Sequence, residues 1–149
     1  MNLNINFFQY QESLKLKSEN RKRYLFDPIR KKYLALQPEE LVRQLIIQYL
    51  VQEALFPLCR IAVERQLKVH EMTKRCDLLV FDANYKPFLL IECKAPQVAI
   101  TERVFEQIAH YNIPLKVSYL VASNGIETYC SAIDHRKKKF QFLDYIPRI

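Results

Sequence analysis

The sequence contains very little glycine, since Gly125 is the only one among 149 residues. P-loops and dinucleotide-binding loops each need several glycines, because their backbone approaches phosphate groups closely. Neither motif fits this sequence. An ATP-driven motor and a Rossmann-type oxidoreductase are therefore excluded.

Long apolar runs are missing as well. No run approaches the roughly 20 residues that a helix needs to span a bilayer, and the first nine residues lack the charged and then apolar pattern of a signal peptide. We therefore expect a cytoplasmic protein without membrane contact, whose cysteines are buried, reduced thiols. The cysteines are widely separated and form no C-x-x-C metal-binding pair: Cys59, Cys76, Cys93 and Cys130.

Hydrophobic and basic residues are plentiful. Half of the residues are hydrophobic, and the length suits one globular domain with its own core. The formal net charge of +7 favours polyanions such as nucleic acids as partners. A solvated face of lysine and arginine explains many basic compositions equally well, so the charge alone does not define a partner.

Residues 1–23 are expected to form an N-terminal arm, and residues 24–149 the main domain. The arm mixes aromatic residues such as Phe7 and Tyr10 with the basic run Arg21–Arg23. Aromatic and basic side chains together suit nucleic-acid binding. The alternative is that the arm packs on its own domain or on a second copy.

Apolar periodicity predicts both helices and strands in the main domain. Pro38 suits the first turn of a helix, and apolar residues three and four apart follow it. Thr101 suits the N-cap of a second helix that ends near Asn112. A basic turn at 136–139 precedes the last expected strand. The expected strands cover two pieces within 24–36, and then about 60–70, 76–82, 88–94, 117–122, 126–132 and 140–143.

The strand expected at 88–94 ends in two charged residues. Residues two apart in a strand share a face, so Glu92 and Lys94 project together after an apolar run. Burying two charges is costly unless they pair or bind an ion. Asp77 opens the apolar run of the preceding strand, and a hairpin would bring its carboxylate close to Glu92 and Lys94.

Two carboxylates and an ammonium group at one end of a sheet suit the hydrolysis of phosphodiesters. Oxygen ligands such as Asp77 and Glu92 select Mg²⁺, with Mn²⁺ as an alternative, and the backbone carbonyl of Cys93 is a further candidate ligand. Such an ion activates water and neutralises charge on the phosphate. Lys94 is expected to orient the attacking water or to stabilise negative charge. The thiol of Cys93 points to the opposite face, towards the core.

A Glu-x-Lys tripeptide by itself is common, and an ordinary surface ion pair is its default interpretation. The surrounding segments, however, resemble a known family. Lys74–Phe81 and Pro87–Pro96 look like the N-terminal nuclease domain of type I restriction enzyme R (restriction) subunits. The likeness covers about residues 24–132. Three further segments resemble that family's first helix, second helix and a later turn: Leu36–Gln44, Phe105–Asn112 and Ser123–Gly125.

The resemblance implies an α/β domain of the restriction-endonuclease-like fold, in which helices flank a central mixed β-sheet. It also implies a PD-(D/E)xK active site that uses Asp77, Glu92 and Lys94, with Glu40 as an accessory acidic residue. The activity implied is that of a magnesium-dependent DNA endonuclease in restriction-modification.

Gln107 and Tyr111 resemble the Gln-x-x-x-Tyr motif of several nuclease branches. Residues four apart lie on one face of a helix. The functional expectation is that this pair contacts DNA or braces the metal site. The alternative is that both side chains only anchor the helix to the domain.

Other charged residues also allow a structural interpretation. Glu40 can pair with Arg43 at the start of the first helix, and Glu64 can belong to a structural ion pair. Arg75 is expected near the site, where it meets either phosphate or solvent, and the same holds for Lys68 and Lys74.

The sequence departs from the family in one respect. Type I R subunits continue into a helicase-like motor, whereas this chain ends at Ile149 without a nucleotide-binding motif, so we expect a stand-alone nuclease domain. Three hypotheses stay open. The first is an active nuclease, which would act as a homodimer for double-strand cleavage. The second is a non-catalytic nucleic-acid-binding or accessory subunit of a restriction or repair complex. The third is a subunit that cuts only together with a motor or specificity subunit.

Overall fold

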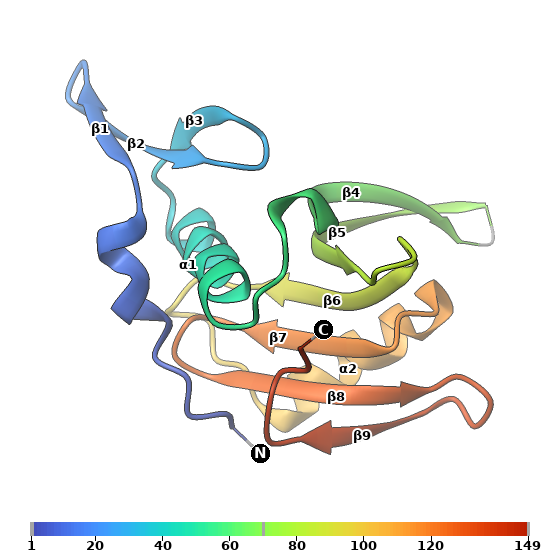
Figure 1. Cartoon of the computed structure of the whole chain (residues 1–149). Coiled ribbons are helices and arrows are strands. Elements are labelled where there is room, and N and C mark those ends of the chain that lie inside the picture. The colour runs from blue at the N-terminus through green and yellow to red at the C-terminus, as the bar shows by residue number, and fades with distance from the viewer. Residues whose placement is uncertain (1, 70, 149) are drawn as a thin grey trace.

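The computed structural model describes residues 2–69 and 71–148, and its main element is a six-stranded sheet (Figure 1). The strand order is β4-β5-β6-β7-β8-β9, and all neighbours are antiparallel except β6 and β7, which are parallel. The expected mixed sheet is therefore confirmed. The strands are β4 (Ile61–Val69), β5 (Met72–Phe81), β6 (Pro87–Cys93), β7 (Tyr119–Ser123), β8 (Thr128–Asp134) and β9 (Lys139–Leu143).

Two helices cover opposite faces of this sheet (Figure 1). Helix α1 (Pro38–Gln52) begins at the predicted proline, and α2 (Glu102–Asn112) is capped by the hydroxyl of Thr101, which accepts a hydrogen bond from the backbone N–H of Val104. Helix α2 lies in the connection between the parallel strands β6 and β7, since parallel strands need a long crossover, usually a helix. Alternate residues of the central strands therefore pack against α1 or against α2.

The two apolar cores follow this alternation. On the α1 side, Leu45 and Ile46 pack with Leu78 and Ile91, all fully buried. The α2-side core is a second cluster, built from Phe105 and Ala109 of the helix and from strand residues that include Leu79, Leu90 and Leu120. Cys93 is fully buried in the α1-side core, as expected for its thiol. Cys76 and Cys130 are also buried, but the expectation is wrong for Cys59, which is exposed.

The N-terminal residues pack on the domain. A 3-10 helix (η1, Phe7–Ser13) precedes a second sheet of three antiparallel strands. Leu3 and Phe7 are buried in the α1-side core. The predicted boundary between residues 23 and 24 falls within one strand of this sheet, so residues on both sides of it belong to the same structural unit. The three strands are β1 (Leu16–Glu19), β2 (Lys22–Asp27) and β3 (Lys32–Ala35).

Most predicted strands differ from the observed ones by only one or two residues at each end. The exception is β5, which begins at Met72 and not at Cys76. The predicted end of the preceding strand at His70 lies outside the described residues. Within the part of the chain that the structure describes, no helix is long and apolar enough to cross a membrane.

Candidate active site

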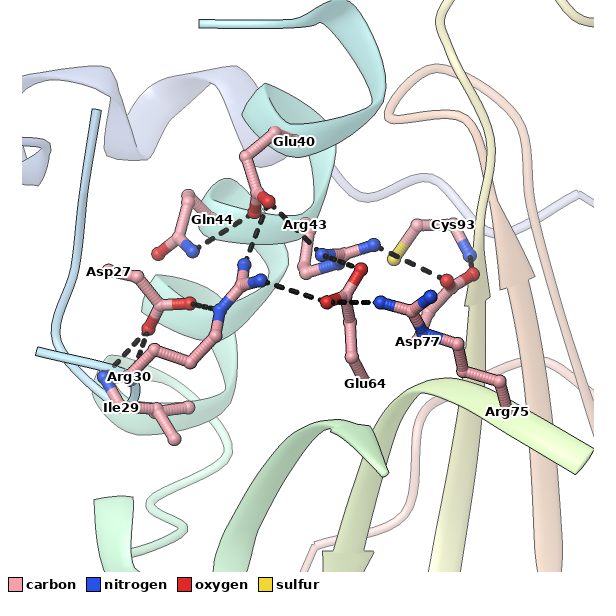
Figure 2. Close-up of polar contacts among 10 residues, drawn as sticks. All are labelled: Asp27, Ile29, Arg30, Glu40, Arg43, Gln44, Glu64, Arg75, Asp77 and Cys93. Carbon is pink, nitrogen blue, oxygen red and sulfur yellow. Dashed lines mark hydrogen bonds and ion pairs between the residues drawn. The ribbon is translucent and has the colours of Figure 1, made fainter. Parts of the chain in front are cut away.

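The β5–β6 hairpin brings the two predicted carboxylates together. Its register pairs Leu78 with Ile91, and the next positions along the two strands are Asp77 and Glu92. Oδ2 of Asp77 accepts a hydrogen bond of 2.8 Å from the backbone N–H of Cys93, directly after Glu92 (Figure 2). The carboxyl group of Asp77 also lies near enough to that of Glu92 to act on its ionisation. Asp77 is thus held against the end of β6 by the N–H group of Cys93.

Glu92 has a strongly perturbed ionisation equilibrium. Burial and the negative charge of Asp77 raise the pKa of its carboxyl group to about 8, and the ammonium group of Lys94 opposes this effect. A hydrogen bond between the two carboxyl groups, which needs a proton on one of them, also favours the protonated form of Glu92. Two neighbouring carboxylates cannot both ionise easily unless a cation compensates their charge. The pair therefore holds a proton in the metal-free protein near neutral pH.

Glu92 and Lys94 open into a pocket of about 380 Å³ that also involves α2. The backbone N–H of Lys94 donates to the carbonyl of Ser123, at the end of β7, over 2.9 Å, which fixes the backbone beyond the last residue of β6. Four of the residues predicted from the sequence thus meet in one pocket although they come from two separate segments. The pocket is lined by Arg75, Glu92, Lys94, Gln107, Ile108, Tyr111 and Asn112.

Gln107 and Tyr111 are exposed on the pocket side of α2, and 58% of Tyr111 is accessible to solvent. Phe105 and Ala109, which are fully buried, anchor the helix to the domain, while the side-chain amide of Asn112 donates to the carbonyl of Ile108 within the same helix over 2.8 Å. Gln107 and Tyr111 thus line the pocket, and the functional expectation for the Gln-x-x-x-Tyr pair stays a prediction beside the anchoring alternative.

Glu40 is not among the residues that line this pocket. It belongs to a network of arginines and carboxylates (Figure 2). Its Oε1 accepts hydrogen bonds from Arg30 over 2.7 Å and from Arg43 over 3.1 Å, and Oε2 accepts one from Gln44 over 3.2 Å. The predicted pairing with Arg43 is therefore present. Arg43 also lies 3.4 Å from Oδ1 of Asp77, so Glu40 is connected to the carboxylate pair through one buried guanidinium group.

Glu64 belongs to the same network. Its carboxylate forms ion pairs with Arg75 over 2.6 Å, Arg30 over 3.1 Å and Arg43 over 3.4 Å. Burial raises the pKa of Glu64, but the hydrogen bond from Arg75 and the charges of the three arginines outweigh it and lower the pKa. The predicted structural ion pair is confirmed.

The backbone at Glu64 is strained. Its φ of 51° lies in the left-handed region, and the ladder of pairs between β4 and β5 skips the position where Glu64 faces Asp77. Strand irregularities of this kind redirect neighbouring side chains and occur often beside functional sites. Here the irregularity coincides with the residue whose carboxylate pairs with Arg43 of α1 and with Arg75 of β5.

Arg30 was not singled out from the sequence, although it connects the N-terminal sheet to the site. Its Nε donates to Asp27 over 2.6 Å, while the carboxylate of Asp27 also accepts from the backbone N–H groups of Ile29 and Arg30. The available signal was the Asp27-Pro28 turn with an arginine three residues after the aspartate. The ion pairs with Glu40 and Glu64 join segments distant in sequence and left no local pattern.

Replacing Arg30 with methionine is expected to lower the free energy of unfolding by about 2 kcal/mol at pH 7, because it leaves the fully buried Asp27 without its guanidinium partner. Burial raises the pKa of Asp27, but the hydrogen bonds from Arg30 and Ile29 outweigh it and lower the pKa. This stabilisation is present above the ordinary pKa of the carboxyl group and is lost as the pH falls. The difference should therefore shrink towards about pH 3.

Urea unfolding of Arg30→Met at pH 7 and in acid measures this effect. Lys31→Met is the matched control, because Lys31 is exposed and adjacent. Equal stability of Arg30→Met and wild type at pH 7 would contradict the role given to Arg30.

The side chains available for a metal ion are few. Among the described residues, no group of three or more His, Cys, Asp or Glu side chains is arranged to hold one. A closed zinc site, which needs four protein ligands, therefore has no counterpart in that part of the chain. Mg²⁺ commonly binds through one or two carboxylates and completes its shell with water and substrate phosphate. The pair of Asp77 and Glu92 fits this second type.

The fold defines a mixed α/β domain in which two carboxylates lie on neighbouring strands, Asp77 within β5 and Glu92 near the end of β6, with Lys94 directly after β6. The family model for the type I restriction enzyme R protein N terminus (HSDR_N) matches residues 38–147. The chain therefore belongs to this family, and its relation to restriction-modification systems follows.

Comparison with solved structures finds the fragment structure of a candidate HsdR subunit of a type I restriction enzyme from Vibrio vulnificus YJ016. The two chains share 19% sequence identity with a TM-score of 0.36, and the match covers 60% of this chain. This chain spans only 17% of the length of that neighbour. No curated protein matches the sequence.

Proposed function

We propose that this protein is a Mg²⁺-dependent deoxyribonuclease with a PD-(D/E)xK active site on a restriction-endonuclease-like fold. The observation that carries the proposal is the position of Asp77 and Glu92 side by side on β5 and β6, with Glu92 and Lys94 in one pocket. Membership of the type I R protein N-terminal family supports it. The order of helix, three antiparallel strands, helix and parallel strand agrees with the proposed fold.

In this proposal Asp77 and Glu92 hold the metal ion, and the backbone carbonyl of Cys93 is a third ligand. The raised pKa of Glu92 supports the assignment. It means that a second negative charge beside Asp77 is unfavourable without a cation, and a bound metal ion would compensate that charge. When bound, Mg²⁺ would supply positive charge at the scissile phosphate and acidify a water molecule.

The remaining pocket residues act on the substrate. Lys94 donates a hydrogen bond to the attacking water or to a phosphate oxygen, where its charge stabilises the negative charge that develops. Gln107 and Tyr111 offer hydrogen-bonding groups on the opposite side of the pocket and would position the DNA strand. Arg75 lines the same pocket and is 62% exposed at its side chain, so it can meet a flanking phosphate while one nitrogen stays paired with Glu64.

A second candidate is that the domain cuts DNA only within a larger assembly, together with a motor or specificity subunit. Membership of a family defined by the N termini of type I R proteins favours it. In this case the carboxylate pair would bind Mg²⁺ in the isolated protein, while cleavage would need the partner.

The test is cleavage of supercoiled and linear DNA by the purified protein with Mg²⁺, with Mn²⁺, and with EDTA in excess. The first candidate predicts cutting with either metal and none in EDTA. Metal binding by calorimetry without cutting would favour the second candidate. Neither cutting nor metal binding would reject both and leave a non-catalytic nucleic-acid-binding module.

A further inference from the structure

A second pocket, of about 360 Å³, lies beyond the C-terminal end of α2. Its walls come from α2, the segment that follows it and the turn between β8 and β9. Every ionisable side chain in these walls is basic, and the remaining ones are apolar. The lining residues are His110, Ile113, Pro114, Lys116, His135 and Lys138.

The two histidines of this pocket are held in place by other contacts. Nε2 of His135 lies 2.6 Å from the carbonyl oxygen of Val117, within hydrogen-bonding distance. The ring of His110 packs edge-on against Phe140, with 5.6 Å between the ring centroids. The walls of the pocket are therefore fixed independently of any ligand.

The lysines, by contrast, have no carboxylate partner among the described residues. Among the ion pairs of residues 2–69 and 71–148, none includes Lys116 or Lys138. Asp134, the acidic residue nearest in sequence, uses Oδ1 to accept hydrogen bonds from the backbone N–H groups of Arg136 and Lys137 over 3.0 and 3.1 Å. The β8–β9 turn thus presents its basic side chains to solvent, next to the pocket.

This basic pocket and the candidate active site flank the same end of one helix. Tyr111 and Asn112 line the active-site pocket, whereas His110 and Ile113, immediately before and after them in the chain, line the basic pocket. A polyanion that enters the active-site pocket and continues past the end of α2 therefore reaches Lys116 and Lys138 next. A concave site with several positive charges and no compensating carboxylate favours phosphate groups.

We propose that the pocket formed by His110, Lys116, His135 and Lys138 is a second phosphate site, which binds the DNA backbone next to the phosphodiester that is cut. This inference rests on the proposed nuclease function and adds to it the path of the strand. Contacts of this kind position the duplex and carry no sequence information.

The experiment compares the double variant Lys116→Gln/Lys138→Gln with Lys31→Gln/Lys32→Gln, which removes the same two charges from exposed residues at the start of β3. Binding to a short DNA duplex is measured in EDTA across a range of salt concentrations. The pocket variant should bind roughly tenfold more weakly, and its salt slope should fall by about 2, because each lost phosphate contact removes about one unit. The control should match wild type. Cleavage with Mg²⁺ should show a raised KM with kcat retained.

Two outcomes would overturn this inference. One is equal DNA affinity and salt slope in the pocket variant and wild type. The other is that the pocket binds inorganic phosphate in an NMR titration, while DNA binding does not depend on Lys116 and Lys138. The pocket would then be a site for small anions and not for DNA. If wild-type protein binds DNA through these lysines but never cuts it, the phosphate site stands and the proposed nuclease activity fails.

Discussion

Replacing Lys94 with alanine is expected to reduce Mg²⁺-dependent DNA cleavage by about 100-fold or more, the usual cost of removing one donor that stabilises charge in the transition state. Lys94 lies in the pocket with Glu92, and its backbone is fixed by the hydrogen bond to Ser123. The substitution leaves that backbone contact intact. The fold should therefore survive, and the loss should appear mainly in kcat.

Lys94 also acts on the ionisation of Glu92. Its positive charge opposes the rise in the pKa of Glu92, so Lys94→Ala should also change the Mg²⁺ affinity near neutral pH. Cleavage measured at saturating Mg²⁺ and at pH 8.5 separates the two effects, because the site is then fully occupied in both proteins. Lys86→Ala is the matched control, since Lys86 is exposed in the turn before β6. Equal activity of Lys94→Ala and wild type under these conditions would show that Lys94 takes no part in the reaction.

The parts of the fold that could be predicted are those encoded by short-range patterns. Helix α1 has a proline at its start and an apolar stripe, and strands β5 and β6 are apolar runs separated by a five-residue turn. A short turn between two strands allows little besides an antiparallel hairpin. This is why the approach of Asp77 to Glu92 followed from sequence spacing alone.

The start of β5 could not be predicted, because residues 72–76 pair with β4 but not with β6. That part of the hairpin has only one neighbouring strand and contains exposed polar residues, such as Thr73 and Arg75. The apolar alternation that marks a half-buried strand is therefore absent there.

The network around Arg30 and Arg43 was hidden for a different reason. Its ion pairs join residues up to 34 positions apart, and charged residues are expected on the surface unless a partner is known. The sequence suggested Glu40 with Arg43 only because they lie three apart on one helix. It contained no comparable signal for the approach of Arg43 to Asp77.

Replacing Glu92 with glutamine is expected to abolish cleavage and, at the same time, to stabilise the metal-free protein at pH 8. Burial and the charge of Asp77 raise the pKa of Glu92 from 4.5 to about 8. Between these values the folded state holds a proton that the unfolded state has released. Stability therefore falls as the pH rises through this window, by at most about 1.4 kcal/mol per pH unit.

Glutamine has no proton to lose, so the Glu92→Gln protein lacks this slope. Its advantage in free energy of unfolding should be small at pH 5 and grow to roughly 1–3 kcal/mol at pH 8, which corresponds to a Tm higher by several degrees. Thermal unfolding at pH 5, 6.5 and 8 in EDTA measures the effect. Glu106→Gln is the control, because Glu106 is exposed on α2. A pH profile of Glu92→Gln that is parallel to that of wild type would contradict the coupled pair.

Mg²⁺ should reverse this order of stability. An ion that binds Asp77 and Glu92 must displace the proton, so it should raise the Tm of wild type more at pH 8 than at pH 6 and leave Glu92→Gln nearly unchanged. An equal Mg²⁺ response in both proteins would place the ion elsewhere. The expected result links the two roles of Glu92, since the charge that destabilises the metal-free fold is the one that binds the catalytic ion. Such a cost is typical of active sites, where a residue retained for activity is not the most stable choice for its position.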